Sequence, residues 1–194
     1  MAEAIIGSLV NGGAVKADDI RVIDPVEARR ELLQREYSVC TFADPSACIE
    51  SADLIVFAVK PQDLETAARQ IGALSSGQLV LSILAGVKLE RLQMSLEHNL
   101  IVRAMPNTPA RIGRSMTVWT STPAVSAAQH DVVRSVLHTL GEELYVLPQP
   151  SAAGALSSSM RPPLASMEPV HVLFTQSSQR TANEPEALIR RTLR

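Results

Sequence analysis

Apolar and polar residues alternate along residues 1–147 in blocks that predict strands and helices in turn. Residues 54–59 (L-I-V-F-A-V) form the longest wholly apolar run, which is typical of a parallel strand covered on both faces and is too short to cross a bilayer. Strands alternating with helices predict an α/β fold with a doubly wound, mostly parallel Rossmann-type sheet. Further strands are predicted at 20–23, 37–41, 79–84, 100–102, 116–120 and 144–147, and helices at 1–10, 26–34, 45–50, 62–71, 89–96 and 126–140.

The pattern changes after residue 147. Six of the twelve prolines lie in the last 47 residues, together with only one glycine, Gly154. Residues 170–174 are predicted as a lone strand and residues 186–193 as a short helix, while the rest shows neither period. We therefore predict an incomplete dinucleotide-binding domain over residues 1–147 and an irregular C-terminal tail over residues 148–194.

Composition narrows the class of protein. The chain has 194 residues, of which 46% are hydrophobic, enough for one sizeable core. A net charge of -2 gives no electrostatic case for nucleic acid or an anionic membrane. Cys40 and Cys48, in a chain without a signal-like start, predict a reducing, cytoplasmic protein in which both are small core residues without a disulfide. The four histidines share no metal-ligand spacing with other ligand residues, so we expect no metal site.

The stretch R-A-M-P-N-T-P at residues 103–109 predicts a rigid loop at a strand end. Its two prolines fix their own φ and restrict the residue before each, so Met105 and Thr108 are not expected to continue a helix. We expect the side chains of Asn107 and Thr108 to be held outward. In open parallel sheets ligands bind beyond the carboxyl ends of the strands, which favours ligand contact, although a tight structural turn is the alternative.

A glycine-rich phosphate turn, G-x-G-x-x-G, is absent from the sequence. If residues 1–10 form the first helix of the fold, the strand and glycines that lead into it are expected before Met1. Asp24 then falls about 20 residues beyond them at the end of the second strand, where an acidic residue meets the adenosine ribose.

Three motifs together resemble the pyrroline-5-carboxylate reductase family. M-P-N-T-P follows an apolar strand, with A-V-K-P-Q at 58–62 and L-A-G-V at 84–87 upstream in the family's order and spacing. Met1, Ala2, Ala4 and Ile5 match its Asn-Met-Ala-x-Ala-Ile. The resemblance covers residues 1–157 and implies NAD(P)H-dependent reduction of 1-pyrroline-5-carboxylate to proline. It also implies a small-molecule substrate and a homo-oligomer, without nucleic acid or membrane.

The resemblance also implies which residues contact the cofactor, NADP or NAD. The loop from Ala58 to Pro61 lies along it, and Asn107 and Thr108 shape the nicotinamide and substrate end. For Lys60 the alternative is a surface lysine that only packs its stem, and for Ala85 a helix-start turn. No acid or base is identified as catalytic. The implied cofactor-binding residues are Asp24, Ala58, Val59, Lys60, Pro61, Ala85, Asn107 and Thr108. Asp24 favours the free ribose of NADH, whereas Arg29 and Arg30 are placed to reach the 2′-phosphate of NADPH.

Three departures from the family limit what the resemblance implies. The glycine turn is missing, Asp44-Pro45 replaces Asp-Asn, and after Ser157 no S-G-S-G-P or helical domain follows. A shifted reading frame and true divergence both give this pattern. We expect a central gap in the sheet with unpaired backbone groups, and a chain that is inactive by itself. The alternative functions are a non-catalytic relative or binding module, and a Rossmann oxidoreductase acting on another small imine or acid.

Overall fold

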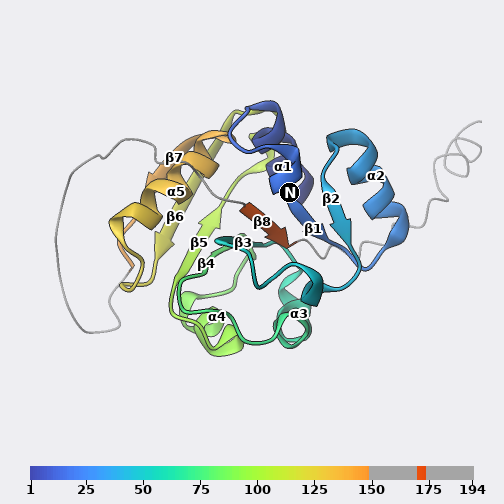
Figure 1. Ribbon diagram of the computed structural model, residues 1–194. Helices are drawn as coiled ribbons and strands as arrows, with labels where there is room; N and C mark the ends of the chain where they lie inside the picture. The colour runs from blue at the N-terminus through green and yellow to red at the C-terminus, as the bar shows by residue number, and fades with distance from the viewer. Residues whose placement is uncertain (149–169, 174–194) are drawn as a thin grey trace, which may run out of the picture.

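A computed structural model describes residues 1–148 and 170–173, and its centre is one eight-stranded sheet (Figure 1). The strand order is β2-β1-β8-β3-β4-β5-β6-β7, and every neighbouring pair is parallel except β5 and β6. The strands are β1 Arg21–Ile23, β2 Cys40–Phe42, β3 Leu54–Phe57, β4 Leu79–Ser82, β5 Ile101–Met105, β6 Ser115–Ser121, β7 Gly141–Tyr145 and β8 Val170–Leu173. The predicted α/β Rossmann-type fold is confirmed.

Five α-helices and four 3-10 turns connect the described strands. The α-helices are α1 Ala2–Asn11, α2 Glu27–Tyr37, α3 Leu64–Ile71, α4 Leu89–Leu96 and α5 Ala127–His138. The 3-10 turns are η1 Ala17–Asp19, η2 Pro45–Ala47, η3 Pro61–Asp63 and η4 Thr108–Ile112. No helix in these residues is long and apolar enough to cross a membrane.

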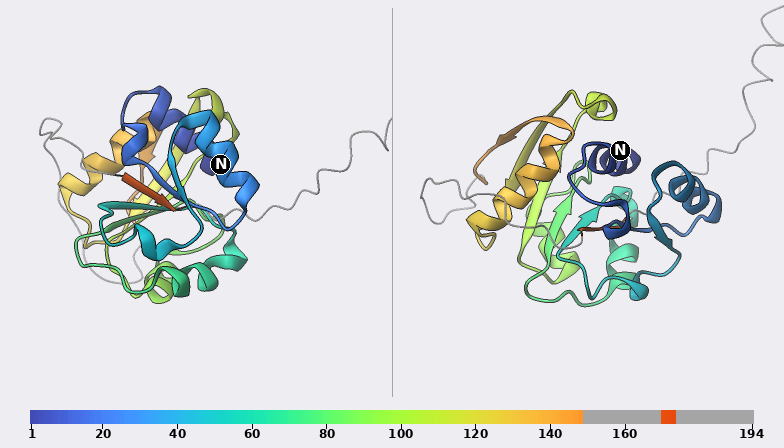
Figure 2. Two further views of the ribbon diagram at one scale, coloured as in Figure 1. Left: turned by 45° about the vertical axis from the view of Figure 1, so that its right-hand side comes forward. Right: turned by 45° about the horizontal axis from the view of Figure 1, so that its top comes forward.

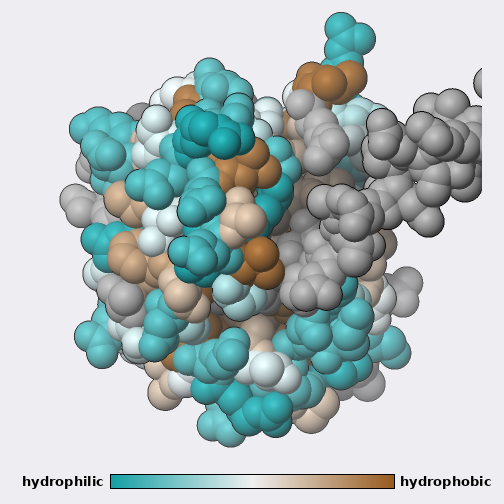
Figure 3. All heavy atoms as spheres, turned by 90° about the vertical axis from the view of Figure 1, so that its right-hand side faces the viewer, coloured by the Kyte–Doolittle hydropathy of each residue, from teal (hydrophilic) through white to brown (hydrophobic). Residues whose placement is uncertain are grey.

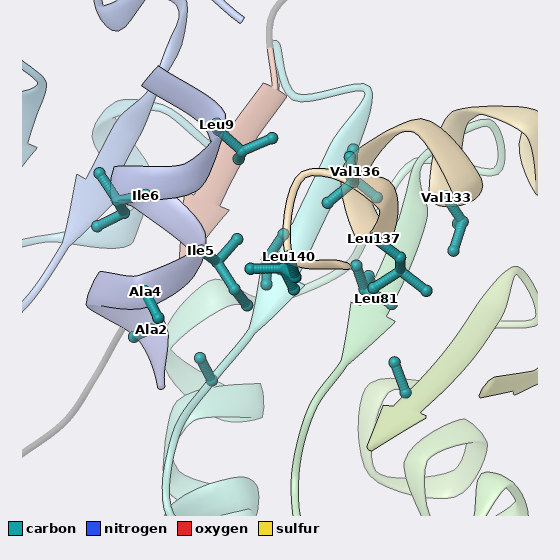
Figure 4. Packing of buried hydrophobic residues seen from close by; sticks show 14 of the residues in the cluster. Ala2, Ala4, Ile5, Ile6, Leu9, Leu81, Val133, Val136, Leu137 and Leu140 are labelled. Carbon is teal, nitrogen blue, oxygen red and sulfur yellow. The ribbon is translucent and has the colours of Figure 1, made fainter. Parts of the chain in front are cut away.

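The helices form a layer on each face of the sheet (Figures 1 and 2). One buried cluster joins α1 and α5 to the sheet through Ile5, Leu137 and Leu140, among others. Ile5 and Leu140 point toward one another over the strands (Figure 4). The second cluster packs α3 and α4 against the opposite face through Leu64 and Leu92. Burial of both faces explains why residues 54–59 read as continuously apolar.

Local chemistry explains where several elements begin and end. Ser126 and Gln129 form a reciprocal capping box that starts α5. Gly141, at φ 136°, begins β7 where an added Cβ would lie 2.4 Å from a Ser115 carbonyl oxygen, so the position requires glycine. The helix predicted at 62–71 consists of two consecutive elements, η3, with Pro61 in its first turn, and α3. As predicted, Thr108 does not continue a helix: it opens the 3-10 turn η4, with Pro109 in the first turn.

Strand β8 occupies the centre of the sheet, where we had expected a gap with unpaired groups. Residues 170–173 pair with β1 on one side and β3 on the other. The strand predicted at 170–174 is therefore present, but it is not a lone strand. The expectation failed because a strand's partners cannot be read from its own short apolar run. The helix predicted at 186–193 lies outside the described residues. The boundary predicted at residue 147 stays a prediction for the rest of the tail.

The two cysteines differ in their surroundings. Both are free thiols, and Cys48 is buried as predicted, which raises its pKa by desolvation. Cys40 is exposed, so its assignment to the core was wrong. It begins β2, an edge strand of the sheet, where one face stays open to solvent.

The face of the molecule over α2 and α3 is largely hydrophilic, with single hydrophobic residues between (Figure 3).

Candidate cofactor site

Four parallel strands bring the predicted cofactor residues to one edge of the sheet. Asp24 follows β1, residues 58–61 follow β3, Ala85 lies after β4 and Asn107 follows β5. Because β1, β3, β4 and β5 all run in the same direction, these loops lie on the carboxyl edge. Helix α1 begins at this edge too, since Glu3 in its first turn contacts Arg29 in the first turn of α2. The predicted cofactor residues, from Asp24 to Thr108, therefore lie along one edge of the sheet.

These residues differ in how far they reach solvent. Asp24, Ala58 and Val59 are buried, and Lys60 and Pro61 are partly exposed. Ala85, Asn107 and Thr108 are exposed. These three side chains, a methyl group, an amide and a hydroxyl, are the solvent-accessible part of the predicted cofactor site. The exposed end therefore lies at the loops after β4 and β5.

Asp24 holds the turn between β1 and α2 together. Its side chain is 1% exposed, and its Oδ1 accepts a hydrogen bond from the Val26 amide at 2.9 Å. Its carbonyl oxygen accepts from Arg30 Nη1 at 2.8 Å. These contacts fix the start of α2 beside the strand end, as an Asx turn does. Contact between Asp24 and a ribose stays a prediction, since the carboxylate already serves the turn.

The two arginines expected to reach a phosphate are both engaged within the protein. Arg29 Nη2 lies 2.7 Å from Glu3 Oε2, and Arg30 binds the Asp24 carbonyl. The Tyr37 hydroxyl donates to Glu3 Oε1 at 3.4 Å, and burial together with the Glu3 carboxylate raises the pKa of Tyr37. Glu3 could not be singled out from the sequence, because its partner Arg29 lies 26 positions away. Glu3 therefore competes with an anionic ligand for Arg29.

The side chain of Asn107 is exposed, as expected, and its carbonyl oxygen is also tied to β6. Its Oδ1 accepts from Ser115 Oγ at 3.0 Å and from the Met116 amide at 3.2 Å. Among the described residues its Nδ2 group donates to no protein atom. Thr108 is exposed as expected. The carbonyl side of the Asn107 amide thus fixes the loop, and the NH₂ side is left to donate to a ligand. Ser115 is the positioning residue that the sequence analysis missed.

Asp44 and Pro45 form the start of the 3-10 turn η2. Asp44 caps η2 by accepting a hydrogen bond from the Ser46 amide at 2.9 Å. That bond lowers the pKa of the Asp44 carboxyl. The carboxylate is thereby committed to the turn, in keeping with a departure from the family's Asp-Asn.

A hollow of about 510 Å³ lies beside α1. Its walls come from α1, the end of α2, the end of η4 and the end of α5. No residue of the predicted cofactor group lines it. Its lining includes Glu3, Gly7, Ser8, Asn11, Tyr37 and Thr139. Volume alone does not identify the candidate site in this protein.

Ser121 and His130 form a close pair at the other edge of the sheet. Ser121 Oγ lies 2.8 Å from His130 Nε2 and 3.4 Å from the Tyr145 hydroxyl. Ser121 is 2% exposed, and its hydroxyl lies within the packed contact of α5 with β6 and β7. The arrangement stabilises the packing of α5 on β6 and β7 and is not a nucleophile with its base.

The His130 environment predicts a pH-dependent stability. Burial, and secondarily the charge of Arg134, lower the pKa of His130 from its ordinary 6.5. The unfolded chain then binds the proton more readily, so the contribution of neutral His130 is complete above about pH 6.5 and is lost as the pH falls toward the folded pKa. We expect the free energy of unfolding to fall more steeply between about pH 7.5 and about pH 5.5 in the wild type than in His130→Gln. Urea titrations that give parallel pH profiles for both proteins would contradict this.

Comparisons with known proteins extend over most of the described residues. A family model described as NADP oxidoreductase, coenzyme F420-dependent, matches residues 1–86. A pyrroline-5-carboxylate reductase of Synechocystis sp. is 34% identical over 146 residues, which are 75% of this chain and 55% of that protein. The structure of such a reductase from Coxiella burnetii has a TM-score of 0.68 at 25% identity, covering 75% of this chain and 54% of that one.

A further structure shares the fold. The pyrroline carboxylate reductase of Plasmodium falciparum, solved with NADP bound, has a TM-score of 0.65 at 21% identity and covers 74% of this chain and 52% of that one. The chain thus spans about half the length of the relatives it matches.

Proposed function

Because this chain belongs to the pyrroline-5-carboxylate reductase family, we propose that its sheet edge binds NAD(P)H and serves the reduction of 1-pyrroline-5-carboxylate to proline. The observation that carries the proposal is the meeting of the loops after β3, β4 and β5 at one edge, with Asn107 fixed from behind by Ser115. The proposed substrate is a small molecule, and a homo-oligomer is expected of the family.

The residues at this edge suit a flat nicotinamide ring. Ala85 carries only a methyl group, and Gly86, at φ 74°, has no atom within 4 Å of the place of a Cβ, so nothing there blocks an approaching ring. Asn107 offers an amide donor and Thr108 a hydroxyl. The bound cofactor supplies the hydride that reduces the imine carbon. The chain's own part is positioning, because a protonated cyclic imine is already electrophilic and needs mainly a fixed orientation.

A chimera tests this proposal against its alternatives. Residues 1–147 are joined to the parts of the Synechocystis relative that the alignment leaves uncovered, and proline formation is followed with NADPH and NADH. We expect proline from the chimera and none from the 194-residue chain alone. A chimera that binds cofactor but forms no proline would favour a binding module, and one that reduces only another imine would favour a different oxidoreductase.

Cofactor preference is expected to depend on Asp24. A carboxylate there repels a 2′-phosphate, whereas serine removes the charge and its hydroxyl still accepts from the Val26 amide. In the chimera, Asp24→Ser should therefore raise kcat/KM for NADPH relative to NADH. Glu3→Gln, which releases Arg29 from its ion pair, should shift the ratio in the same direction. If Asp24→Ser leaves the ratio unchanged, Asp24 is not at the ribose.

A further inference from the structure

Main-chain pairing holds β8 in the middle of the sheet from both sides. His171–Leu173 pair with Arg21–Ile23 of β1, and all of Val170–Leu173 pair with Leu54–Phe57 of β3, both in parallel. Val172 lies in register with Val22 and Val56, which have no exposed surface. Figure 2 shows β8 between these strands, and Figure 4 shows it running beneath α1. The strand is therefore part of the core of the sheet.

Strands β1 and β3 do not pair with each other, because β8 lies between them. Neighbouring strands lie about 4.8 Å apart, so β1 and β3 stand about 9.6 Å apart across β8, roughly three times the length of a hydrogen bond. Ile23 and Ile55 on one face, and Val22 and Val56 on the other, line this position in the two buried clusters. The space between β1 and β3 takes one extended strand.

Only a long connection ties β8 to the rest of the described chain. Strand β7 lies at the far edge of the sheet, five strand spacings or about 24 Å from β8. The residues from Tyr145 to Val170 reach about 80 Å when extended. The connection is long enough to let β8 enter the sheet from β7. Main-chain pairing with β1 and β3 holds the strand in place.

We propose that the position between β1 and β3 is a strand-binding site and that residues 170–173 are its ligand. The site takes an extended peptide of the sequence V-H-V-L, parallel to β1 and β3. Its tether raises the local concentration of the ligand to the order of millimolar. When the tether is cut, the same sequence binds from a separate molecule.

The test cuts the full-length protein. A single protease site is inserted between Ser158 and Ser159, and the cleaved protein is separated by size-exclusion chromatography. We expect the C-terminal fragment to elute with the rest. A fluorescent peptide of residues 166–177 in excess should then displace it, and binding to the uncut protein should be at least tenfold weaker because the tethered strand competes. Hydrogen exchange of residues 21–23 and 54–57 should stay slow with the peptide bound.

The matched control is the same peptide with Val172→Pro, which lacks one ladder donor and should bind at least tenfold more weakly. In the full-length chain Val172→Pro should speed hydrogen exchange in β1 and β3 more than in β6 and β7. If the cleaved protein loses its fragment and unfolds, recovery of slow exchange on adding the wild-type peptide supports the proposal. Equal binding of both peptides, or no uptake of the wild-type peptide, overturns it.

Discussion

Replacing Asn107 by aspartate in the chimera is expected to lower kcat for pyrroline-5-carboxylate by a factor of roughly 5 to 150. Aspartate keeps the oxygen that accepts from Ser115 Oγ and the Met116 amide, but it loses the NH₂ donors. The loop therefore stays in place while the proposed ligand contact is removed. Losing one positioning contact costs on the order of 1 to 3 kcal/mol of transition-state stabilisation.

Three companion variants separate ligand contact from loop position. Asn107→Ala removes both and should be at least as slow as Asn107→Asp. Ser115→Ala keeps the ligand donor but loosens the loop, so its effect should be smaller. Thr108→Ala should also lower turnover, while Thr108→Ser, which keeps the hydroxyl, should not. Kinetics like the wild type in Asn107→Ala and Thr108→Ala would end the assignment of this loop.

Replacing Trp119 by alanine is expected to lower the free energy of unfolding by about 3 to 5 kcal/mol, the usual cost of removing a buried aromatic ring. Trp119 is 1% exposed and is the largest fully buried side chain among the described residues. Its ring lies 4.6 Å from that of Tyr145 and 5.3 Å from that of His130, centroid to centroid. Its Nε1 donates to the Glu143 carboxylate. Removal leaves both a cavity and a carboxylate without its donor.

The matched variant Trp119→Phe retains a ring and loses only the donor and part of the volume. We expect it to cost about 1 to 3 kcal/mol, less than Trp119→Ala. Urea denaturation followed by circular dichroism measures both values. Changes under about 1 kcal/mol for both variants would show that β6 and β7 do not unfold with the rest of the sheet.

The order of elements could be predicted because each has its own period in the sequence. Helix α4 has the predicted bounds, and the strand predicted at 116–120 is extended by one residue at each end in β6. The motif A-V-K-P-Q also placed its residues at a strand end correctly, since β3 finishes at Phe57. The bounds of these elements depend on residues close together in the sequence, and a single sequence contains that information.

Features that depend on distant residues could not be predicted in the same way. The ion pair of Glu3 with Arg29 and the bond from Ser115 to Asn107 arise only when separate elements meet. The same holds for β8, because a parallel strand may pair with any other and its sequence does not say which. The sequence therefore predicted the strand at residues 170–174 but not its place in the sheet.

The late position of β8 in the chain has a consequence during protein synthesis. About 115 residues separate the end of β3 from the end of β8. At about 5 to 20 residues per second, a ribosome needs roughly 6 to 23 s to add them. Through that interval the nascent β1 and β3 have their apolar side chains in place but no strand between them. A chaperone that shields apolar segments on the ribosome should therefore increase the yield of soluble protein, and slow translation after Phe57 should reduce it.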